Sequence, residues 1–252
     1  MIRPLLTIFL CSIPAIATAD ESGAALRAES DWSAAVAMVS TNHRLQLLDA
    51  PRQTELRGSL GHGKAQPENA VPPPAPYVDL KFDWLSSEPP TDFQQTREGE
   101  SLIRSTCRVG KARITRTYLV DPEDGSVLIH LLANMPGALS FRVSLSGTGE
   151  VAPRIEDRRE LIRTVPDGVS AHVRVVPFES DVSPDGKSIL VRGEGEALIL
   201  LSYAAGADAP KTLAETWKRL AQRHDPGNNP PDPVKIWHAV LGERLKSIEN
   251  SP

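Results

Sequence analysis

Apolar and polar positions alternate most regularly between residues 100 and 149, in four extended runs that three turn sequences separate. In the last run, residues 139–146, every second side chain is apolar, as in an antiparallel strand with one buried face. Residues 127–133 are apolar on both faces except at His130, which predicts a central strand with a hydrogen-bonded core histidine. The turns come from Gly110 with Lys111, residues 122–125, and Pro136 with Gly137. The pattern predicts a β-meander.

Further extended runs lie on both sides of this stretch and bring the expected total to ten or eleven strands. They include residues 77–84, 169–178, 189–191 and 197–203, with a turn at 183–187. Residues 32–48 fit a helix through their Ala and Met content, or a hairpin through the break at Asn42, and we favour the hairpin. So many strands with turns between them predict a large antiparallel β-sandwich.

The last quarter of the chain changes to a helical period. Asp208 and Pro210 open one predicted helix, and Asp232 caps a second. The apolar stripes consist of Leu213, Trp217, Leu220 and Ala221 on the first, and of Ile236, Trp237, Val240, Leu241, Leu245 and Ile248 on the second. Each stripe must be buried against the sandwich, another domain or another chain. Trp237, Leu241 and Leu245 are therefore candidates for a partner-facing surface.

The chain begins with the features of a secretory signal peptide. Arg3 precedes an apolar run, and an Ala-Thr-Ala sequence ends at Ala19, after which cleavage is expected. The predicted organisation is a signal peptide at 1–19, a β-sandwich domain at 20–206 with a Pro-rich connector at 65–76, and a helical segment at 207–252. No apolar run approaches the length of a membrane span. The mature protein is expected to be secreted or periplasmic.

Composition narrows the class of partner. With 40% hydrophobic and 24% charged residues the sequence suits a globular protein, and its net charge of −4 gives no basic footprint for nucleic acid. Removing the signal peptide leaves one cysteine, Cys107, which shares a predicted strand face with Ile103 and Val109. We expect a buried, unreactive thiol.

No constellation nominates an active site, a metal or a cofactor. Residues 58–64, GSLGHGK, match the spacing of a phosphate-binding loop, but Ala65 stands where Ser or Thr would hold Mg²⁺, and no strand is expected before it. The histidines lack metal-ligand spacing, and there is no Gly-x-Ser-x-Gly sequence. His43 and His172 fall on polar strand faces and are expected to be exposed.

Aromatic side chains raise the question of a sugar platform, because aromatic faces stack on sugar rings. Trp217 and Trp237 fall on apolar helix stripes, which favours packing. Trp84 and Phe93 flank a predicted loop, so they are the candidate carbohydrate-contacting residues. The alternative is that both aromatic side chains are buried in the core.

Residues 100–149, which we call the organising stretch, resemble together with their flanking segments the N-terminal domain of glycoside hydrolase family 95, the α-L-fucosidases and their relatives. The resemblance rests on VDLKFDW at 78–84, PTDF at 90–93, ITRTY at 114–118, VLIHLL at 127–132 and PGALSF at 136–141. Residues 37–39 and 44–47 are similar to that family's first hairpin. The resemblance implies a fold of the super-sandwich type and an association with carbohydrate.

The departures from that family are equally informative. Its Leu-Pro-x-Gly-Asn-Gly loop is replaced by Ser30-Asp-Trp-Ser33, and its catalytic residues lie in a following α/α barrel that this sequence does not contain. The resemblance therefore implies a domain that is noncatalytic alone and that binds a partner chain supplying the barrel. The alternative is a free-standing glycan-binding or cell-envelope module. Burial of the Trp237 stripe on the sandwich would favour the alternative, and its exposure would favour the missing partner.

Overall fold

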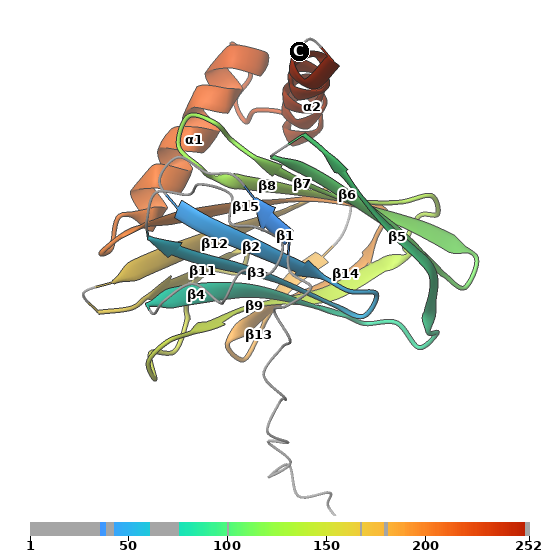
Figure 1. The fold of residues 1–252 in the computed structure, drawn as a ribbon, viewed down its shortest axis with the longest axis horizontal. Helices are drawn as coiled ribbons and strands as arrows, with labels where there is room; N and C mark the ends of the chain where they lie inside the picture. The colour runs from blue at the N-terminus through green and yellow to red at the C-terminus, as the bar shows by residue number, and fades with distance from the viewer. Residues whose placement is uncertain are drawn as a thin grey trace, which may run out of the picture. The chain divides into compact units, whose positions relative to one another are not determined.

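The computed structural model describes residues 36–38, 43–60, 76–99, 101–166, 168–178 and 181–249. Within these ranges the chain forms fifteen strands and two helices, and all of them belong to one contact unit, Trp32–Pro252. The protein is mainly β, with two antiparallel sheets and two C-terminal helices, as Figure 1 shows. The predicted signal peptide and most of the Pro-rich connector lie outside the described residues.

The first sheet has seven strands and draws on the first third of the chain and on later segments. Its order is β1 (Val36–Met38), β2 (His43–Asp49), β3 (Gln53–Leu60), β4 (Tyr77–Trp84), β9 (Leu139–Gly147), β14 (Ser188–Glu194) and β13 (Asp181–Asp185). β1 and β2 pair antiparallel, with Val36 opposite Leu47. The hairpin interpretation is therefore confirmed for the part of 32–48 that the structure describes.

The second sheet has eight strands and includes most of the organising stretch. Its order is β10 (Arg154–Asp157), β11 (Glu160–Thr164), β12 (Val169–Pro177), β15 (Glu196–Ala205), β8 (Val127–Ala133), β7 (Ala112–Val120), β6 (Leu102–Val109) and β5 (Pro90–Glu98). β8 lies between β15 and β7, so the central position predicted for it is confirmed.

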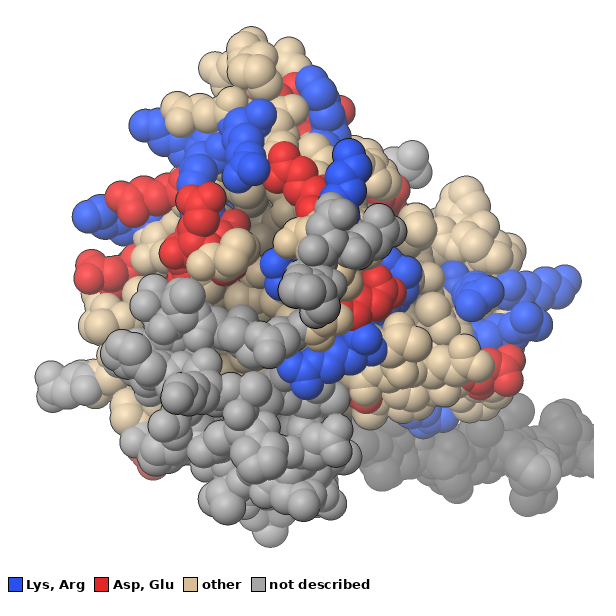
Figure 2. Space-filling view, turned by 45° about the horizontal axis from the view of Figure 1, so that its top comes forward, with Lys and Arg blue, Asp and Glu red and all other residues tan. Residues whose placement is uncertain are grey.

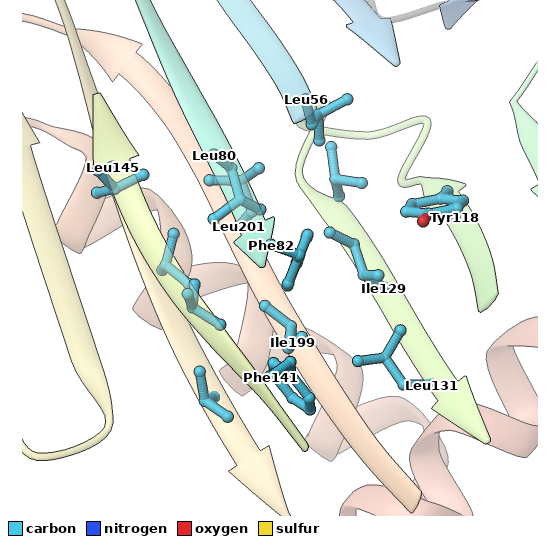
Figure 3. Close-up of a cluster of buried hydrophobic side chains, with 14 of the residues drawn as sticks. Leu56, Leu80, Phe82, Tyr118, Ile129, Leu131, Phe141, Leu145, Ile199 and Leu201 are labelled. Carbon is cyan, nitrogen blue, oxygen red and sulfur yellow. The ribbon is translucent and has the colours of Figure 1, made fainter. Parts of the chain in front are cut away.

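The inner faces of the two sheets share one apolar core, which makes the arrangement sandwich-like. Every second residue of β9, from Leu139 to Leu145, is buried there, as the alternation predicts. Side chains from β3, β4 and β9 of one sheet meet side chains from β7, β8 and β15 of the other, as Figure 3 shows. Cys107 belongs to this core and is a buried free thiol, as expected.

The predicted four-stranded meander is wrong in its last step. β6, β7 and β8 are consecutive neighbours in the eight-stranded sheet, but β9 pairs with β4 and β14 in the seven-stranded sheet. Gly137, with φ +74, lies in the turn where the chain passes from one sheet to the other. The turn sequence predicted a corner but carried no information on which sheet the next strand would join.

Several strands have no clear alternation and were missed. β3 lies where the periodicity fades, β5 follows Pro89 in a stretch expected to be a loop, and β10 and β11 are short and charged. Gly58, in the sequence that resembles a phosphate-binding loop, is a β3 residue paired with Val78. A Cβ at Gly58 would collide with the ring of Tyr203 on the facing sheet, so close approach of the two sheets explains this glycine.

The helices α1 (Ala209–His224) and α2 (Pro233–Glu249) lie on the outer face of the eight-stranded sheet (Figure 1). Asp232 caps α2, since its Oδ1 accepts hydrogen bonds from the backbone N–H groups of Val234 and Lys235 at 2.9 and 3.3 Å. The helix stripes and the outward side chains of the sheet form a second apolar cluster, with Leu102, Leu119, Leu128, Leu198, Leu200, Leu213, Leu220, Ala221, Ile236 and Trp237. No described helix is long and apolar enough to cross a membrane.

The helices cover the outer face of the eight-stranded sheet, and this corrects the expectation that His172 is exposed. His172 lies on the outward face of β12 and is only 4% exposed, because α1 packs over that face. Ser170 on the same strand and Ser202 on the adjacent strand β15 anchor the start of α1: Ser170 Oγ accepts from the backbone N–H of Ala209 at 3.2 Å, and Ser202 Oγ donates to its carbonyl at 2.7 Å. The side chain of His43 lies outside the described residues.

Candidate functional site

Trp84, one of the two aromatic candidates for sugar contact, is partly buried at the end of β4. The guanidinium carbon of Arg116 lies 4.2 Å from the centre of its ring, and Phe82 and Phe141 pack against it at 6.1 and 5.6 Å between ring centroids. Its indole N–H points to Thr54 Oγ1 at 3.4 Å. One face of the indole is therefore occupied by Arg116 in a cation–π contact.

Arg116 belongs to a buried polar cluster that ties the two sheets together. Its Nη1 donates to Asp49 Oδ1 at 2.7 Å and to the carbonyl of Ala50 at 2.9 Å, and its Nη2 donates to the carbonyl of Pro51 at 2.9 Å. Burial opposes the charge of Arg116, but the Asp49 carboxylate together with Tyr118 and Cys107 outweighs that effect, and the pKa of the guanidinium is raised. The cluster holds the β2–β3 turn against β7, which is a structural role.

The cavity beside Trp84 is small. Trp84, Arg52, Ser86 and Ser140 line a cavity of about 100 Å³, whereas ligand sites enclose roughly 300–1,000 Å³. Phe93 does not line this cavity. It lies on β5 of the other sheet, at an irregularity between Thr91 and Gln94 where Asp92 has φ +54, and it packs partly buried against the inner core.

The three candidates for a partner-facing surface lie along α2. Trp237 is 1% exposed and stacks on the ring of His130, with 4.7 Å between centroids and 20° between planes. Leu241 and Leu245 are partly buried against the same outer cluster. His130, predicted to be a hydrogen-bonded core residue, is buried beneath α2 and shares a 2.6 Å hydrogen bond with Glu196 Oε1.

A larger cavity opens where the two helices meet the end of β7 and the β7–β8 loop. We call it the helix–sheet pocket, and its volume is about 410 Å³. Leu119, Val120, Leu220 and Val240 give it apolar walls. Its charged lining residues are Asp121, Glu123, Arg219, Arg223, Glu243, Arg244 and Lys246, together with His224. Figure 2 shows acidic and basic side chains intermingled over the helical part of the surface.

Arg219 joins α1 to the acidic β7–β8 loop. Its Nη2 donates to Asp121 Oδ2 at 2.8 Å and to Asp124 Oδ2 at 3.1 Å, and its Nη1 donates to Glu123. Burial raises the pKa of Asp121, although a hydrogen bond from the backbone N–H of Glu123 and the charge of Arg219 act in the opposite direction. The carboxylates of this loop are therefore occupied by Arg219.

The two other arginines of the pocket differ in their partners. Arg223 Nη2 lies 2.9 Å from Glu243 Oε2, in an exposed pair that links α1 to α2. Arg244 Nη2 donates to the neutral hydroxyl of Ser101, and Arg244 Nε is buried without a hydrogen-bond partner. Among the described residues Arg244 has no carboxylate partner, so it presents an uncompensated cation to the pocket.

The lining of the helix–sheet pocket is compatible with binding of a small molecule. No group of three or more His, Cys, Asp and Glu side chains is arranged to hold a metal within the part of the chain that the structure describes. Burial raises the pKa of the Cys107 thiol, which opposes formation of a nucleophilic thiolate. The helix–sheet pocket combines apolar walls with a few convergent polar groups, as small-molecule sites do.

The sequence analysis did not single out the helix–sheet pocket. It described only the apolar stripes of the two helices and did not assign a role to their polar residues. One signal was present: Arg244 follows Trp237 by seven residues, a spacing that places both on one side of a helix and therefore turns Arg244 toward the sheet. The β7–β8 loop was predicted only as a turn, and its contribution depends on the docking of α1.

Comparison with known proteins leaves the family open. No family model matches the chain, and no curated protein sequence matches it. One similar solved structure is described as a kojibiose phosphorylase from the human microbiome, with 8% sequence identity and a TM-score of 0.38. The match covers 86% of this chain and 38% of that one, so this chain spans well under half of that structure. Likeness at this level assigns neither a family nor a function.

Proposed function

We propose that this chain is a noncatalytic, carbohydrate-associated binding module that folds and works on its own, with the helix–sheet pocket as its binding site. Of the two hypotheses drawn from the sequence, this is the free-standing one. The carbohydrate association rests on the sequence resemblance to the N-terminal domain of glycoside hydrolase family 95.

Burial of Trp237 is the observation that carries the proposal. A stripe awaiting a partner chain would leave its largest apolar side chain in water, whereas Trp237 is 1% exposed and contacts His130 of the chain's own sheet. Ile236, beside it, has no exposed surface, and Leu213 of α1 is 1% exposed. The helices are therefore packed on this chain's own sheet, and this supports the free-standing alternative over the missing partner.

The size and chemistry of the helix–sheet pocket support a binding role. At about 410 Å³ it lies within the range of small-molecule sites. Val240 and Leu220 can pack against the C–H face of a sugar ring, and the carboxylate of Glu243 can accept hydrogen bonds from sugar hydroxyls. The cavity at Trp84 is smaller, at about 100 Å³, and Arg116 occupies one face of the indole.

The test combines mass, binding and activity measurements on the purified mature chain. We expect a monomer in light scattering, binding of at least one oligosaccharide class on a glycan array, and no release of fucose from an aryl α-L-fucoside. Fucose release that tracks the purified chain would refute the noncatalytic assignment. An array without any bound glycan, repeated at millimolar ligand by calorimetry, would refute the carbohydrate assignment.

Export is a separate proposal that rests on the sequence of residues 1–19. We expect the protein recovered from a bacterial host to begin at Asp20 and to fractionate with the periplasm or medium. Intact-mass measurement of the recovered protein checks both points. A cytoplasmic protein that retains residue 1 would contradict the proposal.

A further inference from the structure

We propose that the helix–sheet pocket selects acidic sugars, with Arg244 binding the carboxylate of a uronic acid. The inference deepens the proposed function and rests on it for the sugar component of the ligand. The acidic component comes from the charges that line the pocket.

Three observations single out Arg244. The other two arginines of the pocket are paired: Arg219 with the carboxylates of the β7–β8 loop and Arg223 with Glu243. Arg244 instead contacts the hydroxyl of Ser101, and its Nε is buried without a partner. An arginine guanidinium stays cationic in proteins and has five N–H donors. A carboxylate entering the pocket would supply the missing charge partner, and two parallel N–H···O bonds would fix its orientation.

The surroundings of Arg244 restrict what else the ligand can be. Glu243, which precedes Arg244 in α2, and Asp121 across the pocket both line it. Because Arg223 and Arg219 already pair with these carboxylates, Arg244 is the arginine of the pocket that the described residues leave without one, which matches a ligand with a single negative charge better than a polyphosphate. A uronic acid carries one carboxylate on a ring of hydroxyls, so its single charge can meet Arg244 while its hydroxyls donate to the acidic side chains. Val240 and Leu220 remain available for the ring's C–H face.

Matched sugars provide the decisive comparison, because a uronic acid and its parent hexose differ only at C6. The probes are glucuronate and galacturonate with their short oligomers, glucose and galactose with theirs, and acetate and inorganic phosphate as simple anions. Affinities are measured by calorimetry and by ligand-detected NMR. We expect an acidic sugar to bind at least tenfold more tightly than its neutral counterpart and more tightly than either simple anion.

Three variants connect the binding to Arg244. Arg244→Gln keeps hydrogen-bonding groups but removes the charge, and it should weaken binding of the acidic sugar by tenfold or more. Ser101→Ala removes the internal partner of Arg244 and should leave binding intact. Arg154→Gln removes an exposed cation on β10, paired with Glu156 at 2.9 Å, and should also leave binding unchanged. If Arg244→Gln fails to fold, Arg244→Lys, which keeps the charge but loses the bidentate geometry, should show a smaller loss.

The outcomes separate this inference from the proposed function. Equal affinity for acidic and neutral sugars would overturn the inference and leave a glycan-binding module in place. Equal affinity for acetate or phosphate would overturn it in favour of a general anion site. Equal losses in Arg244→Gln and Arg154→Gln would overturn it as nonspecific charge attraction. Failure of every sugar, acidic or neutral, would overturn both proposals.

Discussion

Replacing Trp237 with Ala tests whether α2 completes the fold. The side chain is 1% exposed, between His130 of β8 and the apolar cluster under the helices. A buried Trp removes roughly 150–250 Å² from water, which corresponds to about 4–6 kcal/mol of transfer free energy at about 25 cal/mol per Å². Truncations of large buried aromatic residues cost about 3–5 kcal/mol. Because α2 lies at the surface and can partly collapse into the space, we expect a loss of about 3–4 kcal/mol.

Urea unfolding followed by far-ultraviolet circular dichroism measures this loss without depending on tryptophan fluorescence. His238→Ala is the matched control, because His238 is the next residue of the same helix and is exposed; its effect should stay within about 0.5 kcal/mol. Equal midpoints for wild type and Trp237→Ala, with equal slopes, would refute the docking of α2 on the sheet. The free-standing function would then lose the observation on which it rests.

Four further predictions test the packing of the chain. Arg116→Met leaves Asp49 charged and buried, so it should lower the unfolding free energy by about 3–5 kcal/mol in urea titrations. Burial lowers the pKa of His172 in the folded protein below its ordinary 6.5, despite the nearby Glu160. As pH falls, the unfolded chain therefore binds the proton before the folded protein does, and the stability present above about pH 6.5 should be lost as pH falls through the lower pKa of the folded state. Urea midpoints measured at several pH values detect this loss. Gly58→Ala should cost about 1–3 kcal/mol, because its Cβ meets a ring, whereas Gly242→Ala, with open space on α2, should stabilise by up to about 1 kcal/mol in thermal unfolding.

Each of these changes has its own control. Arg142→Met breaks a half-exposed pair with Asp185, so a loss as large as that of Arg116→Met would contradict the role of burial. His172→Gln should flatten part of the pH dependence, and unchanged curvature would assign the effect to other groups. Tyr203→Leu should relieve part of the cost of Gly58→Ala. If the two alanine variants shift stability in the same direction, the close approach of the sheets at Gly58 is not the cause.

The candidate site shows where prediction from sequence reached its limit. The apolar stripes of both helices were visible in the sequence, and their burial followed from the cost of leaving large apolar side chains in water. The sequence did not decide whether the sandwich, another domain or another chain would bury them. Arg219, Arg223 and Arg244 become one pocket only because α1 and α2 pack against each other beside the end of β7. Trp84 illustrates the converse: the sequence nominated its aromatic face, but Arg116, from a strand of the facing sheet, occupies it.

The sequence by itself determined local structure wherever a repeating pattern or a turn residue was strong. Local sequence was enough to predict the alternation in β9, the two-sided apolar run of β8, the glycine turns and the cap at Asp232. Each of these features depends on residues that are close together in the sequence. The tertiary structure alone decided which sheet β9 joins, why His172 is buried and where a ligand fits. Those outcomes depend on contacts between segments far apart in sequence, and a polar side chain looks the same in the sequence whether water or a helix covers it.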